Sequence, residues 1–515
     1  MSSLFSDHYN AAHDLLGRNL TPARRNLVAY IDKHGSHTYA QLSERAGRFA
    51  GALRALSVLS EQRVALCLSD TIDFPATFLG AIQHGAVPIP LNTRLTTKDY
   101  TYILADSRTT ALVVSADLYP RFAPALSQLP HLNHVILSGG IAEGHLTLDE
   151  LLAQAEPSTD FADTRRDDMC FWLYTSGTTG QPKGVVHAQD HLIQTAHLYA
   201  IPILGLVAED VVYSAAKLYF AYGLGNALTF PMAVGATTIL LEGPPTPAAI
   251  GHVFREHQPT VFYGVPTLYG MLLANKDLLP DKDALTLRAC TSAGEALPPE
   301  LLRRWRERTG VEILDGLGST EGLHIFLSNR TGDVRPGASG RPVPGYALRI
   351  VDDDGQPVPV GEMGSLEVSG PTTAMMYWNQ RSKTKRVFRG PWMRTGDKYR
   401  QDEEGYFYYE GRSDDLMKVG GIWVSPFEVE STLIEHDAVQ ECAVVAHPDH
   451  DGLIKPKAFV VLAAGHAPSD DLAAALKDFV KQRLAPFKRP RWVAFLDELP
   501  KTATGKIQRY KLRID

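Results

Sequence analysis

Short apolar runs alternate with helix-like periods along the first two thirds of the chain. Runs at residues 63–68, 111–115, 134–138, 237–241, 260–263 and 288–291 predict strands, and residues 74–84 predict an amphipathic helix. Helical stretches separate several of these strands, which is the pattern of parallel-sheet α/β layers. The chain therefore predicts a large N-terminal α/β domain of layered sheets covered by helices.

The pattern changes twice toward the C-terminus. After about residue 336, apolar runs at 346–351 and 364–368 are joined by Gly- and Pro-rich turns, which predicts a small β subdomain. Beyond the segment Gly411-Arg412-Ser413-Asp414-Asp415, runs at 428–435, 442–446 and 472–484 predict a separate small α+β domain. We therefore expect two domains, 1–413 and 414–515, with the boundary between Ser413 and Asp414.

Composition narrows the class of protein. A chain of 515 residues exceeds one ordinary hydrophobic core, and a formal net charge of −7 argues against a nucleic-acid surface. Cys67, Cys170, Cys290 and Cys442 lie too far apart for a zinc motif or a disulfide framework. The first residues lack a basic region followed by an apolar core, and no run reaches the ~20 apolar residues of a membrane span. We expect a cytoplasmic protein with neither nucleic acid nor a membrane as partner.

One segment carries more chemistry than any other. Residues 174–187 read Tyr-Thr-Ser-Gly-Thr-Thr-Gly-Gln-Pro-Lys-Gly-Val-Val-His. Hydroxyl donors, glycines and one lysine suit a polyphosphate, although Gly184 after Lys183 departs from the common P-loop. An apolar run at 170–174 precedes the loop, and we expect a helix to begin near His191. The loop would then lie at a strand end, where open α/β sheets bind ligands; a polar surface loop is the alternative.

This segment resembles the phosphate loop of the adenylate-forming superfamily, which comprises acyl-CoA ligases, luciferases and the adenylation domains of peptide synthetases. Later motifs follow in the family's order, so the resemblance spans nearly the whole chain. It implies that a carboxylic acid is activated with ATP, which needs cations and amide dipoles around the phosphates and a metal, usually Mg²⁺. The phosphate-loop contacts implied are Thr175, Ser176, Gly177, Thr178, Thr179 and Lys183.

The resemblance extends to Gly316-Leu317-Gly318-Ser319-Thr320-Glu321. It implies that Thr320 contacts the α-phosphate, that Ser319 belongs to the nucleotide site and that Glu321 helps to hold Mg²⁺. The residues alone favour a helix start with Ser319 or Thr320 as N-cap, and the phosphate-loop segment shifts the balance to the functional reading. Both readings agree with an anion site, because a helix N-terminus attracts anions.

Three further stretches resemble the family's nucleoside contacts. Gly294, Glu295 and Ala296 correspond to the adenine-binding segment, which Asp315 and Gly316 would complete; a tight strand-to-helix turn is the alternative. Asp397 in Thr395-Gly396-Asp397 would accept hydrogen bonds from the ribose hydroxyls, and Arg412 would be a second ribose contact. Without the resemblance, these residues would be read as a turn and a surface ion pair.

In the family, the small C-terminal domain is mobile and presents two faces to the active site. The resemblance implies that Asp414 is the hinge and that Lys506, in Pro500-Lys501-Thr502-Ala503-Thr504-Gly505-Lys506, meets the acid carboxylate and the phosphate during adenylation. On the other face it places Lys418, with Gly420 and Gly421 beside a channel for the CoA thiol. Solvated charge and a plain hairpin are the alternatives.

The acyl pocket resembles the benzoate-CoA ligase branch at residues 217–226, 323–329 and 421–428. The resemblance implies a flat aromatic ring surrounded by Ala221, Tyr222, Gly223, Leu317, Gly318, His324 and Ile325. No Asp follows Phe220, which disfavours amino-acid substrates. Gly322 departs from the branch, where a bulky residue, often Met, follows the Thr-Glu pair; we expect either unfilled space beside the acyl pocket or a requirement for positive φ.

Together these motifs favour an aryl-acid–CoA ligase that uses ATP, Mg²⁺ and CoA and releases AMP and pyrophosphate. An aryl-acid adenylating enzyme that loads a carrier protein is the first alternative. A non-catalytic AMP-binding protein is the second, although Lys183, Glu321 and Lys506 disfavour it. Nothing positive supports a luciferase-like oxygenase, and a homodimer is left open.

Overall fold

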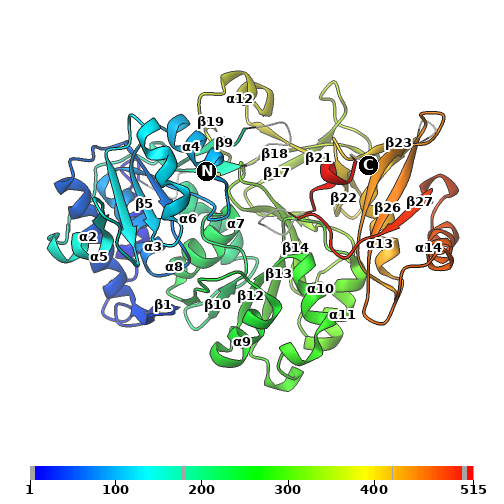
Figure 1. Cartoon of the computed structure of the whole chain (residues 1–515), viewed down its shortest axis with the longest axis horizontal. Helices are drawn as coiled ribbons and strands as arrows, with labels where there is room; N and C mark the ends of the chain where they lie inside the picture. Colours follow the sequence, from blue (N-terminus) through cyan, green and yellow to red (C-terminus); the bar gives the residue numbers. More distant parts are fainter. Residues whose placement is uncertain (1–5, 176–180, 420–421, 502–506, 514–515) are drawn as a thin grey trace.

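The computed structural model describes residues 6–175, 181–419, 422–501 and 507–513. Figure 1 shows layered sheets and helices through the N-terminal two thirds, with the C-terminal residues in orange and red gathered at one end. Within these residues no helix is both long and apolar enough to cross a membrane.

The first layer is a parallel sheet near the N-terminus, in the order β4-β3-β5-β6-β7. Its strands are β3 (Arg63–Cys67), β4 (Val87–Pro90), β5 (Thr109–Ser115), β6 (His134–Ser138) and β7 (Leu146–Thr147). Helix α3 (Asp73–His84) is buried along nearly its whole length, against α1 (Ala11–Gly17) and α2 (Tyr39–Ala55). The predicted amphipathic helix is therefore wrong in character: α3 is covered on all sides, and even its polar Thr77 and Gln83 are buried.

The second layer is a mixed sheet ordered β16-β15-β14-β13-β12-β10-β11-β1-β2, parallel from β14 to β1. Its strands are β1 (Val28–Asp32), β2 (Gly35–Thr38), β10 (Val211–Ser214), β11 (Thr237–Ile239), β12 (Val261–Gly264), β13 (Ala289–Ser292), β14 (Ile313–Gly318), β15 (Ile325–Ser328) and β16 (Arg341–Pro342). Helices α9 (Pro247–His257), α10 (Pro266–Ala274) and α11 (Pro299–Thr309) pack a continuous apolar cluster against β10, β12 and β13. The strands expected at 237–241, 260–263 and 288–291 are all present within two residues.

The phosphate-loop segment differs from the expected strand–loop–helix order. Strand β8 (Met169–Thr175) pairs antiparallel with β9 (Lys183–Ala188), and β19 (Met376–Tyr377) pairs with β9 from the other side. Helix α6 (His191–Thr195) begins where expected, but β9 intervenes. The buried, β-branched Val185 and Val186 explain this strand, which is too short to show a period in the sequence.

The remaining chain forms the β subdomain and the C-terminal domain. The subdomain sheet contains β17 (Ala347–Val351), β18 (Gly364–Ser369), β20 (Phe388–Arg389), β21 (Trp392–Gln401) and β22 (Phe407–Arg412). After β22 come the hairpin β23 (Met417–Val419)–β24 (Ile422–Val424) and the sheet β25 (Val439–Pro448), β26 (Ile454–Leu462) and β27 (Trp492–Phe495). Helices α13 (Pro426–Ile434) and α14 (Asp470–Arg483) share an apolar core with these strands. This core draws only on residues beyond Asp414.

Candidate active site

The phosphate loop closes the β8–β9 hairpin. Thr175 and Lys183 are Cα partners at its loop end, whereas Ser176, Gly177, Thr178 and Thr179 lie outside the described residues. The Lys183 Nζ lies 4.0 Å from Glu321 Oε1 and 4.6 Å from the ring centroid of Tyr377. Burial lowers the pKa of Lys183, and the Glu321 carboxylate opposes that fall. The β8–β9 hairpin thus places the half-buried Lys183 ammonium group beside the Glu321 carboxylate.

The Thr320–Glu321 segment is a tight turn between β14 and β15. Ser319 Oγ accepts a 3.0 Å hydrogen bond from the Gly322 N–H, and Leu323 takes φ +66°, which turns the chain back into β15. The expected helix N-cap at Ser319 or Thr320 is therefore wrong, because the chain after the turn forms β15, which pairs antiparallel with β14. Glu321 is consequently presented by a hairpin.

Two side chains from other elements hold this turn. The ring nitrogen Nε2 of buried His187, on β9, donates a 2.8 Å hydrogen bond to the Thr320 carbonyl. The Tyr377 hydroxyl, on β19, donates a 2.7 Å hydrogen bond to Glu321 Oε1. These two hydrogen bonds connect the Thr320–Glu321 turn to the phosphate-loop hairpin and to β19.

The proposed adenine segment follows the end of β13. Gly294 has φ +96°, a conformation that glycine adopts without strain, and Glu295 and Ala296 come next. Asp315 pairs in register with Ser292 across β13 and β14, and Gly316 pairs with Ser328. The Asp315 side chain is buried, its Oδ1 has no hydrogen-bond partner in the described chain, and burial raises its pKa well above the ordinary value. A buried acceptor without a donor marks a place for a polar ligand.

The proposed ribose contacts lie on paired strands. Asp397 on β21 and Arg412 on β22 are Cα partners, and Arg412 Nη1 lies 3.3 Å from Asp397 Oδ1. The Asp397 carboxylate is the main cause that raises the pKa of Arg412. The structure therefore brings these two sequence-predicted residues into one ion pair.

The C-terminal domain meets the adenine segment beside Lys506, which itself lies outside the described residues. The N–H of Ile507 donates a 2.7 Å hydrogen bond to Glu295 Oε1. Ion pairs fix the flanking chain within the domain, Lys501 to Glu441 at 2.7 Å and Arg509 to Glu430 at 2.8 Å. The chain at Ile507 therefore contacts the N-terminal domain.

The other predicted residues of the C-terminal domain sit on exposed elements. Asp414 lies in an exposed turn directly after β22. Lys418 is exposed on β23, with its Nζ 5.6 Å from the ring centroid of Trp423, itself 50% exposed. Gly420 and Gly421 lie outside the described residues.

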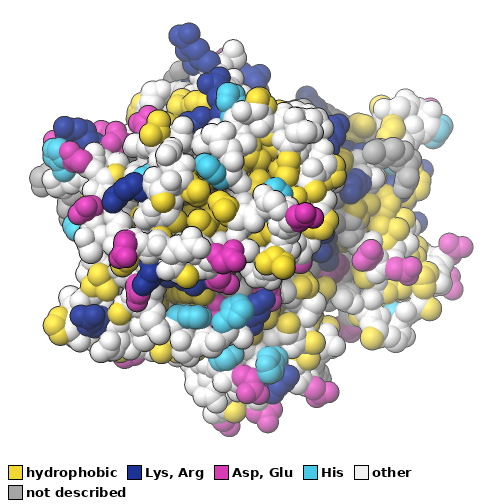
Figure 2. Space-filling view, turned by 60° about the vertical axis from the view of Figure 1, so that its left-hand side comes forward, with side chains coloured by type: hydrophobic (Ala, Val, Ile, Leu, Met, Phe, Trp, Pro, Cys, Tyr) yellow, Lys and Arg dark blue, Asp and Glu magenta, His cyan; other side chains and the backbone are white. Residues whose placement is uncertain are grey.

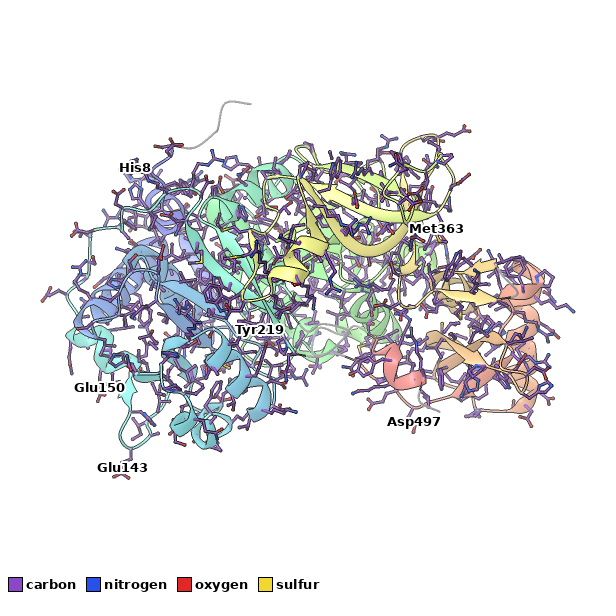
Figure 3. All side chains as sticks on the ribbon, turned by 90° about the horizontal axis from the view of Figure 1, so that it is seen from above. His8, Glu143, Glu150, Tyr219, Met363 and Asp497 are labelled. Carbon is purple, nitrogen blue, oxygen red and sulfur yellow. The ribbon has the colours of Figure 1, made fainter. Side chains whose placement is uncertain are left out.

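The predicted acyl-pocket residues come from two places that meet inside the molecule. Ala221, Tyr222 and Gly223 begin the short helix α7 (Ala221–Leu224), which follows the centrally placed Tyr219 in Figure 3. Leu317 and Gly318 end β14, His324 precedes β15 and Ile325 begins it. The Tyr222 and His324 rings lie 5.5 Å apart, and Gly318 is the register partner of Ile325.

Backbone crowding explains two glycines of this set. A Cβ on Gly223 would lie 2.0 Å from the Lys217 carbonyl oxygen, and a Cβ on Gly318 would lie 2.6 Å from the His324 carbonyl oxygen. Both contacts are with backbone atoms, so neither is relieved by a side-chain movement. These glycines are required by the local fold, whatever ligand the pocket takes.

His324 is a buried neutral base. Its Nε2 lies 3.1 Å from Asn226 Oδ1, whereas its Nδ1 has no hydrogen-bond partner in the described chain. Burial lowers the pKa of His324 to about 3. The Tyr222 hydroxyl is anchored to Thr291 Oγ1 at 2.5 Å. The predicted acyl-site residues therefore pack two aromatic rings together, and one imidazole nitrogen among them has no partner in the described chain.

Gly322 does not open space beside this pocket. A Cβ at Gly322 would lie 2.8 Å from Cδ1 of the buried Phe326 ring, so the expected unfilled space is occupied. The alternative reading is also wrong, because the residue with positive φ is the neighbouring Leu323. Phe326 takes the room that a larger side chain at 322 would need.

Sequence reasoning missed Tyr377, His187 and Asn226 as parts of the site. Tyr377 lies more than fifty residues after Glu321 and reaches it only because β19 pairs with β9. His187 is the last residue of the segment 174–187, and its place in that segment could have marked it as part of the site. Asn226 stands inside the segment compared with the benzoate branch, yet its contact with His324 depends on the packing of two distant elements.

The residues of the candidate nucleotide site lie in a chain that matches two family models. The AMP-binding enzyme family model matches residues 19–378, and the model of the AMP-binding enzyme C-terminal domain matches residues 428–506. The chain belongs to the AMP-binding enzyme family, and the resemblance to adenylate-forming enzymes is confirmed.

Within that family several of the similar proteins are named for aromatic acids. The chain is 57% identical over 509 residues to the benzoate–CoA ligase of Thauera aromatica, covering 98% of this chain and 96% of the relative. It matches the benzoate CoA ligase of Burkholderia xenovorans LB400 with TM-score 0.92 at 51% identity, over 98% of this chain and 100% of that one. The anthranilate CoA ligase AuaEII in complex with anthranoyl-AMP matches with TM-score 0.95 at 44% identity, over 99% and 97%. These structures confirm the predicted fold class.

Proposed function

We propose that the protein is an ATP-dependent, AMP-forming aryl-acid–CoA ligase that joins benzoate or a close relative to CoA. The observation that carries this proposal is the contact of Lys183 with Glu321 near the Asp397–Arg412 pair, together with the packed rings of Tyr222 and His324. Full-length similarity to ligases named for benzoate and anthranilate supports the aromatic acid. The acid would be activated as its adenylate and then transferred to the CoA thiol.

The nucleotide would be recognised by groups already oriented for it. The free Oδ1 of Asp315 is an acceptor for the adenine amino group, and Asp397 accepts from the ribose hydroxyls while Arg412 holds its carboxylate. Lys183 faces the triphosphate, and Thr320 the α-phosphate. Positive groups fixed before the reaction stabilise the charge that develops when the acid attacks the α-phosphate.

Glu321 fits an Mg²⁺ that arrives with ATP. It is one carboxylate with 18% side-chain exposure, and Mg²⁺ in phosphoryl-transfer sites is typically bound by one or two carboxylates plus phosphate oxygens and water. The hydrogen bond from Tyr377 keeps the carboxylate oriented. When bound, the ion would neutralise phosphate charge.

The aryl ring would lie among Ala221, Tyr222 and His324, with Leu317, Gly318, Gly223 and Ile325 completing the walls. Apolar and aromatic walls with few polar groups suit a flat ring. Neutral His324 is a hydrogen-bonding group of the kind that recognises a ring substituent.

The second half-reaction would need the other face of the C-terminal domain. We propose domains 1–413 and 414–515, with Asp414 as the hinge, Lys506 acting in adenylation, and Lys418, Gly420 and Gly421 beside the CoA thiol. The hydrogen bond from Ile507 to Glu295 supports a structure in the adenylation arrangement. The exposed Lys418 and Trp423 are then free to meet the N-terminal domain after rotation.

We also propose a cytoplasmic location, where ATP and CoA are supplied; the four cysteines, all buried free thiols, suit a reducing compartment. The face in Figure 2 intersperses basic and acidic side chains, which fits small-molecule partners rather than nucleic acid.

One assay tests the function directly. Purified protein is given MgATP and a panel of benzoates, with and without CoA, and AMP, pyrophosphate and aroyl-CoA are quantified. We expect AMP and aroyl-CoA in equal amounts, and a loss of at least ~100-fold in Glu321→Gln. Glu362→Gln, at an exposed position, is the matched control. ADP as the product, or transfer only to a carrier protein, would contradict the proposal.

A further inference from the structure

Helix α12 (Arg381–Val387) lies beside the phosphate-loop hairpin, next to β19 and β9 at the top of Figure 1. Thr384 Oγ1 accepts a 3.1 Å hydrogen bond from the Tyr377 N–H, which fixes the helix to β19. Tyr377 in turn contacts both Glu321 and Lys183. The first turn of α12 is therefore held at the edge of the proposed triphosphate site.

Lys383 is the residue directly before Thr384. It is half-buried, whereas Lys385 and Arg386 on the same helix are exposed. Burial lowers the pKa of Lys183, the Glu321 carboxylate opposes that fall, and the positive charge of Lys383 adds to it. Within the described chain, Lys383 forms no ion pair with an acidic side chain.

Two ammonium groups that face each other repel, and desolvation strengthens the repulsion. The neighbouring charges do not cancel it. Glu321 already contacts Lys183 and accepts a hydrogen bond from Tyr377. Arg412 also lowers the pKa of Lys183, and its charge is balanced by its ion pair with Asp397. A cluster with one cation in excess is stabilised by an anion, and the half-burial of Lys383 distinguishes it from the exposed Lys385 on the same helix.

We propose that Lys383 binds the β- and γ-phosphates of ATP together with Lys183, and holds the same oxygens in the pyrophosphate that leaves. The inference rests on the proposed function only for the identity of the nucleotide. No bond is made or broken by Lys383, which is a point charge that positions the leaving group.

The test compares ligands with and without those phosphates. Equilibrium binding of MgATP, pyrophosphate and AMP is measured by calorimetry in wild type, Lys383→Met and Lys383→Arg. Because a hydrogen bond to a charged group contributes about 1.5–3 kcal/mol, we expect Lys383→Met to weaken MgATP and pyrophosphate about 10-fold or more and to leave AMP unchanged. Lys383→Arg should keep most of the affinity, and exposed Lys385→Met is the matched control.

Kinetics distinguish a phosphate-binding role of Lys383 from a merely structural one, because only the first affects the two half-reactions differently. Lys383→Met should raise KM for ATP in pyrophosphate exchange, while thioester formation from supplied benzoyl-AMP and CoA proceeds at the wild-type rate. Equal losses for AMP and ATP, or unchanged ATP and pyrophosphate affinity, would overturn the inference. Binding needs no aromatic acid, so failure of the proposed acid specificity leaves this test intact.

Discussion

The Tyr377 hydroxyl donates a 2.7 Å hydrogen bond to Glu321 Oε1, and the two residues are 56 positions apart in the chain. The same tyrosine ring lies 4.6 Å from Lys183 Nζ. One side chain thus orients the proposed metal ligand and packs against the phosphate-loop cation. The arrangement makes Tyr377 a positioning residue whose removal is measurable.

Replacing Tyr377 by Phe keeps the ring and removes the hydrogen bond. Hydrogen bonds to charged groups contribute about 1.5–3 kcal/mol, so we expect kcat/KM for MgATP to fall about 10-fold, with a raised Mg²⁺ requirement. Tyr9→Phe is the control, because the Tyr9 hydroxyl donates to Asp14 Oδ2 over the same 2.7 Å far from the site in sequence and fold. An unchanged Mg²⁺ dependence would remove Tyr377 from the metal site.

Replacing Gly322 by Met forces a side chain against the Phe326 ring. Overpacking of a core typically costs about 1–3 kcal/mol, so we expect a lower free energy of unfolding and a similar fall in kcat/KM for all benzoates. Adding Phe326→Ala to the Gly322→Met variant should restore part of the stability. Chemical denaturation and a panel of para- and meta-substituted acids measure both effects. If kcat/KM fell only for the substituted acids and the variant remained stable, Gly322 would lie beside the acyl pocket after all.

His324 makes stability depend on pH in a defined direction. Its folded pKa of about 3 lies below the ordinary value of 6.5, so the unfolded chain binds the extra proton between these values. Stability is complete above pH 6.5 and falls by about 1.4 kcal/mol per pH unit below it. His187, with a pKa lowered by burial to about 4, adds a second contribution.

The measurement is denaturant unfolding at several values between pH 5 and pH 7. His324→Gln should lower overall stability and yet reduce the slope against pH by about one proton. Exposed His450→Gln should leave the slope unchanged. The same slope in His324→Gln and wild type would show that His324 is not buried and neutral.

Lys506→Ala should separate the two half-reactions. We expect formation of the acyl-adenylate to fall at least ~100-fold, the scale of losing a charge-stabilising contact, while thioester formation from supplied benzoyl-AMP is largely retained. Lys511→Ala, at an exposed position five residues on, is the control. Rates of both half-reactions are measured by rapid quench. Equal loss in both would show that the two faces of the C-terminal domain do not act separately.

Local sequence predicted the elements well where the pattern was regular. The strand expected at 134–138 has those bounds in the structure, the strand expected at 364–368 extends one residue further, and the strand expected at 288–291 is shifted by one residue. Buried parallel strands are continuous apolar runs, which a sequence displays directly. The same property misled at 74–84, since an apolar run does not reveal that α3 is covered on every side.

For the candidate site too, the sequence predicted some features and the tertiary structure decided others. Lys183, Glu321, Asp397 and Arg412 stand in short motifs whose residue types suit phosphate, metal and ribose, so the sequence by itself determined which chemistry the protein carries. The neighbours of these residues were decided only by tertiary structure: β19 brings Tyr377 to Glu321, and the Phe326 ring fills the space beside Gly322. The physical reason is that motif chemistry is local, whereas contacts between residues far apart in the chain are set by strand pairing and packing, which no local pattern records.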